Sequence, residues 1–110
     1  MPAHSYGDYA QAAHVRGLQC LRPEDAGYRA AGLHWACEPS SPLGGADPAL
    51  AAWPGAPQTA ALRIVDCAYQ PLRLHSSHAP ELHSSAWQLW TPNKALGLTG
   101  VRAAYAIAPQ

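Results

Sequence analysis

The chain has 110 residues, which is enough for one small domain. Seven Lys and Arg residues balance seven Asp and Glu residues, and charged residues make up only 13% of the chain. This balance excludes a module that binds nucleic acid through a basic face, and it excludes a highly charged disordered tail.

Large aliphatic and aromatic residues are few. The chain has 23 Ala, 12 Leu, 3 Val, 2 Ile and no Phe, so four Trp and five Tyr must supply much of the core. We expect a thin core and marginal stability. No apolar run approaches the ~20 residues of a membrane helix, and the first residues lack a signal-peptide pattern. The spacing of Cys20, Cys37 and Cys67 matches no disulfide or zinc framework, which indicates free thiols in a cytoplasmic protein.

Apolar runs alternate with turn-forming residues along the chain. Apolar spacing predicts a helix over 5–16, ended by Gly17, and Asp47 with Pro48 predicts the start of a second helix. Continuous apolar runs predict central strands that are parallel and buried on both faces, as in an α/β fold. The expected strands are 18–21, 33–37, 62–67, 86–91 and 101–107, with irregular helical turns over 23–31 and a bend over 94–100.

Polar residues follow several of the predicted strands. Ser41 comes after strand 33–37, Asp66 closes strand 62–67 with Tyr69 three residues on, and Lys94 and Arg102 come after strand 86–91. Ligands of open α/β sheets bind outside the carboxyl ends of parallel strands, so these side chains are candidates for one site. Each also has an ordinary explanation: a turn-forming Asp, a solvated Lys, or an Arg in a structural ion pair.

The order and spacing of these residues resemble the class I/II aminotransferases, fold-type I enzymes that depend on pyridoxal 5'-phosphate. Residues 91–102, Thr-Pro-Asn-Lys-Ala-Leu-Gly-Leu-Thr-Gly-Val-Arg, are similar to the cofactor-lysine signature of that family. The likeness is greatest to the branch of histidinol-phosphate aminotransferase and threonine-phosphate decarboxylase. Residues 37–44 resemble the Asn-Pro-Thr-Gly turn of the family, and residues 5–9 resemble its Pro-x-Tyr-x-x-Tyr segment.

The resemblance implies roles around the cofactor ring. Lys94 forms the Schiff base and moves the proton at the substrate Cα, and Asp66 pairs with the pyridine nitrogen. Tyr69 donates to the phenolic oxygen of the ring, and Tyr6 stacks on the ring face. Ser41 stands where the family usually has Asn, which shares that oxygen with the Tyr.

Further positions are implied at the cofactor phosphate. Arg102 clamps it with a planar guanidinium, and Thr91 adds a hydroxyl. Asn93 precedes the lysine where the family usually has Ser, and Cys67 follows Asp66 where many members have an acid. These differences weaken individual cofactor contacts without removing the Schiff base.

The implied reaction is amino-group transfer between an amino acid and a 2-oxo acid. Decarboxylation of an amino-acid phosphate, as in the cobalamin pathway, is the nearest alternative. By this resemblance, residues 1–110 correspond to the central part of the large domain of the family, without its Gly-rich phosphate turn and its small domain. The resemblance implies a partial, mostly parallel sheet with an antiparallel last strand. We therefore expect an inactive fragment, which leaves open a non-catalytic remnant or one half of a split enzyme with a complementary chain. Full-length members of the family are expected to be homodimers. A small Trp-lined interaction domain is a third interpretation.

Two further motifs predict no site. The histidines His75, His78 and His83 lie in a Ser-rich stretch without a cysteine, which indicates a solvated loop rather than a metal centre. The pair Gly44-Gly45 lacks the residues that complete a nucleotide-binding loop.

Overall fold

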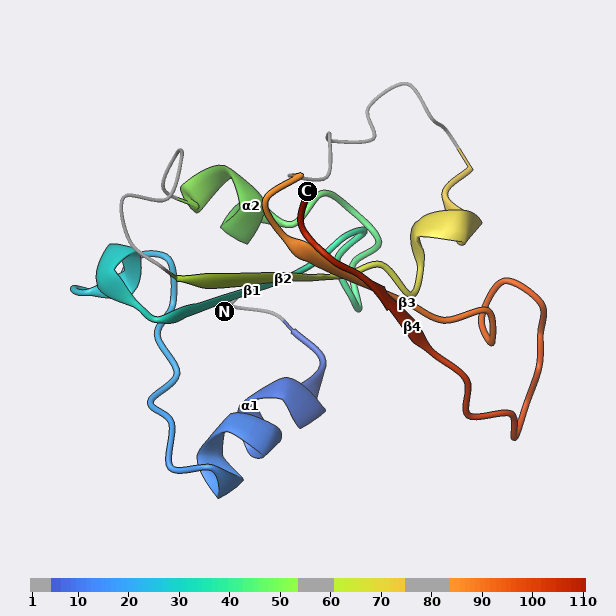
Figure 1. Cartoon of the computed structure of the whole chain (residues 1–110), viewed down its shortest axis with the longest axis horizontal. Coiled ribbons are helices and arrows are strands. Elements are labelled where there is room, and N and C mark those ends of the chain that lie inside the picture. Colours follow the sequence, from blue (N-terminus) through green and yellow to red (C-terminus); the bar gives the residue numbers. More distant parts are fainter. Residues whose placement is uncertain (1–4, 54–60, 75–83) are drawn as a thin grey trace.

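A four-stranded sheet organises the chain (Figure 1). The computed structural model describes residues 5–53, 61–74 and 84–110. The strands β1 (Leu33–Cys37), β2 (Leu62–Asp66), β3 (Trp87–Trp90) and β4 (Tyr105–Ile107) lie side by side in that order. The first two pairs are parallel and the last pair is antiparallel. The predicted α/β class and the antiparallel last strand are therefore confirmed.

Two α-helices cover opposite faces of the sheet (Figure 1). Helix α1 (Gly7–Val15) lies on the face of Trp35 and Ile64, and α2 (Pro48–Ala52) lies on the face of Ala36 and Val65. Asp47 caps α2 as predicted, because its Oδ1 accepts a hydrogen bond from the Ala49 amide at 2.8 Å. Two 3-10 turns, η1 (Tyr28–Ala30) and η2 (Gln70–Leu72), follow α1 and β2 along the chain.

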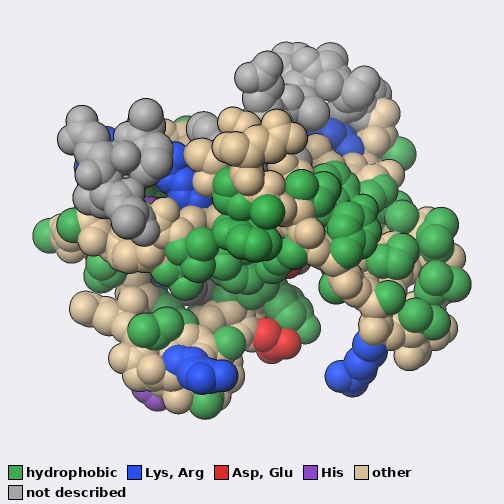
Figure 2. Space-filling view, viewed as in Figure 1, with side chains coloured by type: hydrophobic (Ala, Val, Ile, Leu, Met, Phe, Trp, Pro, Cys, Tyr) green, Lys and Arg blue, Asp and Glu red, His purple; other side chains and the backbone are tan. Residues whose placement is uncertain are grey.

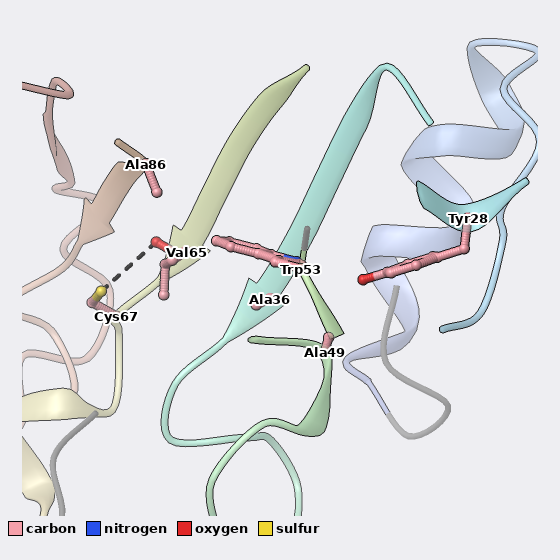
Figure 3. Packing of buried hydrophobic residues seen from close by; sticks show 7 residues of the cluster. All are labelled: Tyr28, Ala36, Ala49, Trp53, Val65, Cys67 and Ala86. Carbon is pink, nitrogen blue, oxygen red and sulfur yellow. Dashed lines mark hydrogen bonds between the residues drawn. The ribbon is translucent and has the colours of Figure 1, made fainter. Parts of the chain in front are cut away.

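The buried apolar cluster lies between the sheet and α2 (Figure 3). The indole of Trp53 extends from the end of α2 across β1 toward Val65, and the ring of Tyr28 approaches it from η1. Most other members are small. They are Ala36, Ala49, Cys67 and Ala86. Because Ala buries little surface, this core is as thin as the composition predicts.

The face of α1 is less well covered. Tyr9 packs on Trp35 with 4.9 Å between ring centroids, yet α1 contains no buried residue. Leu33, Leu62 and Trp87 on this face are each about 40% exposed, at 41%, 43% and 39%. In Figure 2, hydrophobic side chains gather over the strands and over the loop that follows β3.

Two predicted strands differ from the structure. Residues 18–21 form no strand; instead the Leu18 amide donates to the Ala13 carbonyl at 2.9 Å and closes the end of α1. The last strand spans only Tyr105–Ile107 rather than 101–107. Before Tyr105, the carbonyls of Val101 and Ala103 accept hydrogen bonds from the side chains of Asn93 and Thr91 instead of forming part of the strand ladder.

Candidate functional site

The carboxyl ends of the three parallel strands meet at one edge of the sheet. Cys37 of β1 is level with Asp66 of β2, and Asp66 is level with Leu89 of β3. The Glu38 amide donates to the Asp66 carbonyl at 2.9 Å, and the Cys67 amide donates to the Leu89 carbonyl at 2.8 Å. The segments that leave these strands, 38–41, 67–70 and 91–94, therefore begin next to one another. Every site residue predicted from these segments starts from this edge.

Asp66 has partners for both of its carboxylate oxygens. Its Oδ1 accepts a hydrogen bond from the Ala68 amide at 2.9 Å, and its Oδ2 accepts one from the Tyr9 phenol of α1. Burial raises the pKa of Tyr9, and the hydrogen bond to Asp66 raises it further. The sequence does not predict the hydrogen bond between Tyr9 and Asp66, because the two residues belong to different elements and no motif connects them.

Lys94 lies beside the aromatic ring of Tyr69. Its Nζ is 5.6 Å from the ring centroid, within the range of a cation–π contact. The ring of Tyr6 is 5.8 Å from the ring of Tyr9, centroid to centroid. Hydrogen bonding to Asp8 raises the pKa of the Tyr6 phenol. The structure thus brings Lys94 to Tyr69, and it joins Tyr6 through Tyr9 to Asp66.

Thr91 and Asn93 hold the loop that contains Lys94. The Thr91 hydroxyl donates to the Ala103 carbonyl at 2.8 Å and accepts from the Asn93 amide at 3.3 Å. The Asn93 side-chain amide donates to the Val101 carbonyl. These polar groups are engaged within the loop itself. Their role in the structure is to tie the start of the loop to its end, beside Arg102.

Arg102 lies between the two anchored carbonyls. Its side chain is exposed, and it makes no hydrogen bond or ion pair with the part of the chain that the structure describes. No contact joins it to Tyr69 or Lys94 in that part. The predicted phosphate role of Arg102 therefore stays a prediction.

Ser41 lines a pocket next to Tyr69. The pocket has a volume of about 640 Å³ and lies between the turn after β1 and the 3-10 turn η2. Arg73 also lines it, and this residue was not predicted as part of a site. Arg73 forms an ion pair with Glu38, whose side chain is fully buried. The two residues are 35 positions apart, so no local motif reveals the pair.

Hydrogen bonds of Cys37 and Asp47 stabilise this edge of the sheet. The Cys37 amide donates to Asp47 Oδ2 at 2.7 Å, and the Asp47 amide donates to Glu38 Oε2 at 2.7 Å. Burial and the nearby charge of Asp66 raise the pKa of the Cys37 thiol. A thiol held in its protonated form is a poor nucleophile, so the arrangement assigns Cys37 to packing.

Some predictions lie outside what the structure describes. His75, His78 and His83 fall in the 75–83 gap. Over residues 5–53, 61–74 and 84–110, no group of three or more His, Cys, Asp or Glu side chains has an arrangement that would hold a metal ion. Within the same ranges, no helix has both the length and the apolar character that crossing a membrane requires.

The comparisons with known proteins complete this description. No family model, no curated protein and no solved structure matches the chain.

Proposed function

We propose that the chain forms part of an aminotransferase-type site that binds pyridoxal phosphate at Lys94. The observation that supports this most is the position of the Lys94 amine over the Tyr69 ring, at the sheet edge where Asp66 ends β2. Lys94 is also the only lysine of the chain. An amine, a phenol and a carboxylate at one edge are the groups that the cofactor requires.

The arrangement fits the cofactor in two respects. Tyr69 supplies an aromatic ring and a hydroxyl beside the amine, and Asp66 supplies a carboxylate for a ring nitrogen. When bound, pyridoxal phosphate supplies an electron sink that makes the substrate Cα proton acidic. Lys94 Nζ would take that proton and return it, because it is the amine nearest to the site. Tyr69 would hold its hydroxyl toward the ring oxygen.

Two contacts oppose the fit and favour a second candidate function. The Tyr9 phenol already donates to Asp66 Oδ2 and the Ala68 amide to Oδ1, so both oxygens that could accept from a protonated ring nitrogen already have a donor. If these contacts persist, the chain is a non-catalytic remnant or a subunit completed by another chain. Within the enzymatic proposal, amino-group transfer and decarboxylation of an amino-acid phosphate both remain open, since both begin at the same amine.

The test is chemical labelling of the full chain. Pyridoxal phosphate is added, the lysine–aldehyde linkage is reduced with borohydride, and the labelled peptide is mapped. We expect about one label per chain on Lys94, with at least a tenfold loss of affinity in Asp66→Asn, since one charge-assisted contact contributes about 1.5–3 kcal/mol. Asp25→Asn, at an exposed turn, is the matched control.

The outcomes separate the two candidates. Tight labelling that weakens in Asp66→Asn and Tyr69→Phe but not in Asp25→Asn supports the cofactor site. Labelling of the N-terminal amine alone, or labelling of Lys94 that is indifferent to Asp66→Asn, overturns it. A non-catalytic subunit then becomes the better interpretation.

A further inference from the structure

A second polar feature adjoins the proposed site. The pocket of about 640 Å³ that Ser41 lines opens between the turn after β1 and the segment 69–74. Tyr69 belongs both to this pocket and to the contact with Lys94. Tyr69 therefore joins the pocket to the Lys94 amine, and a molecule held at Lys94 can extend into it. Its polar lining decides which chemical group it accepts.

Arg73 is the cation of the pocket lining. Its side chain is 18% exposed, and its Nη2 pairs with Glu38 Oε1. A guanidinium has five N–H donors, so one carboxylate contact leaves most of them available. Arg73 Nε is buried and has no hydrogen-bond partner within the described part of the chain. Arg73 is thus a partly buried cation with spare donors at the wall of a pocket.

Glu38 fixes the position of Arg73. The Glu38 side chain is fully buried, and its other oxygen accepts the Asp47 amide at 2.7 Å. Both oxygens of this carboxylate are therefore engaged, one by the main chain and one by Arg73. A guanidinium held in this way loses little side-chain freedom when it binds a ligand, which favours affinity.

The rest of the polar lining consists of hydroxyl groups. Ser40, Ser41 and Tyr69 line the pocket together with Arg73, and no carboxylate is among its lining residues. Hydroxyls and a guanidinium all donate hydrogen bonds, and the planar guanidinium matches carboxylate and phosphate oxygens. Lys94 adds a second positive charge on the ring of Tyr69.

We propose that the Arg73 pocket is a subsite for an oxyanion, the carboxylate or phosphate group of the molecule whose amino group reacts beside Lys94. The identity of that molecule as an amino acid rests on the proposed function above, but the oxyanion binding does not. Carboxylate and phosphate share the recognising chemistry, so the experiment must distinguish them.

The test measures oxyanion binding by the full chain without cofactor. Inorganic phosphate and acetate are titrated separately at constant ionic strength, with chloride as the reference salt, and amide resonances are followed by NMR. We expect saturable shifts confined to residues 39–44 and 69–74 with one or both anions. Arg73→Gln is expected to weaken binding at least tenfold, and Arg73→Lys less. Arg29→Gln, at an exposed arginine of η1, is expected to leave binding unchanged.

Arg73→Gln leaves Glu38 without its ion-pair partner, so misfolding and a lost ligand contact would both reduce binding in this variant. A second variant separates the two causes. Ser41→Ala keeps the ion pair and removes one pocket hydroxyl, and it is expected to weaken binding severalfold. Shifts with phosphate alone assign a phosphate group, and shifts with acetate alone assign a carboxylate. The proposal is overturned if neither anion produces saturable shifts. It is also overturned if folded Arg73→Gln and Ser41→Ala bind the anions as tightly as the parent chain does. Lys94→Ala removes the second positive charge and is expected to weaken the shifts without abolishing them, so a failure of the cofactor proposal leaves the Arg73 result intact.

Discussion

The phenol of Tyr9 donates a hydrogen bond to Oδ2 of Asp66, and the two residues are 57 positions apart in the chain. This contact joins α1 to the carboxyl end of β2. It binds a side chain of α1 directly to the last residue of β2. Because α1 contains no buried residue, Tyr9 and its packing on Trp35 hold the helix against the sheet.

We expect Tyr9→Phe to lower the free energy of unfolding by about 1.5–3 kcal/mol, the range for a hydrogen bond to a charged group. The same change frees Asp66 Oδ2, so borohydride labelling of Lys94 by pyridoxal phosphate is expected to increase. Urea unfolding and peptide mapping measure the two effects. Tyr6→Phe, which removes a phenol that does not bind Asp66, is the control for stability. Equal stability of Tyr9→Phe and the parent chain would contradict the role of the contact.

Asp47→Ala is expected to destabilise the chain by about 2–4 kcal/mol, because Asp47 accepts two buried main-chain hydrogen bonds. Its oxygens bind the amides of Cys37 and Ala49, at 2.7 and 2.8 Å. Chemical unfolding followed by circular dichroism measures the loss. Asp25→Ala is the matched control, since Asp25 accepts the Arg22 amide at an exposed turn. A loss no larger than that of the control would show that the cap contributes little.

The buried histidine His34 is expected to make stability fall as the solution becomes acidic. Burial lowers its pKa from 6.5, and the neighbouring Arg63 lowers it further; the Tyr28 ring lies 5.1 Å away, centroid to centroid. The folded state therefore binds this proton less readily than the unfolded state. Stability is complete above pH 6.5 and is lost as the pH falls toward the folded pKa, by at most about 1.4 kcal/mol per pH unit for one proton.

Urea unfolding between pH 8 and pH 5 measures this loss, because that range spans the ordinary His pKa of about 6.5. His34→Leu is expected to reduce the slope, whereas His14→Gln, at an exposed position of α1, is expected to keep it. An unchanged slope in folded His34→Leu would assign the acid sensitivity to other groups.

Thr91→Val is expected to loosen the loop that contains Lys94, because the hydroxyl bridges the Ala103 carbonyl and the Asn93 amide. Hydrogen exchange of the loop amides should accelerate by up to about tenfold, as expected for about 1 kcal/mol. Thr99→Val, in the same loop, is the matched control, since its hydroxyl has no hydrogen-bond partner among the described residues. Similar exchange in both variants would contradict the bridging role.

The isolated chain is expected to unfold with a broad transition and to bind a hydrophobic dye. Its buried apolar cluster consists largely of Ala and Cys around Trp53 and Val65, while Leu33 and Leu62 remain about 40% exposed, at 41% and 43%. Scanning calorimetry and dye fluorescence measure these properties. A sharp, reversible transition of the monomer would contradict this expectation.

Local sequence patterns predicted the regular elements where one short segment contains all the information. The segment 62–66, with β-branched Ile64 and Val65 at its centre, specifies a strand through backbone preference, and the pair Asp47-Pro48 specifies a helix start through capping. Trp87 and Trp90 lie on opposite faces, as the alternation of side chains along a strand requires. The strand predicted at 18–21 was wrong because a strand also needs a neighbour to pair with, and this segment closes α1 instead.

The candidate site also has one part that the sequence predicts and one part that it does not. The sequence by itself determined that Asp66 ends a parallel strand and that Tyr69 and Lys94 follow parallel strands, and therefore that all three lie at or start from one edge of the sheet. Only the tertiary structure decided that Tyr9 binds Asp66 and that Arg73 pairs with Glu38. These contacts join residues far apart in the chain, and their geometry depends on how helices and turns pack against the sheet. No spacing along the sequence contains that information.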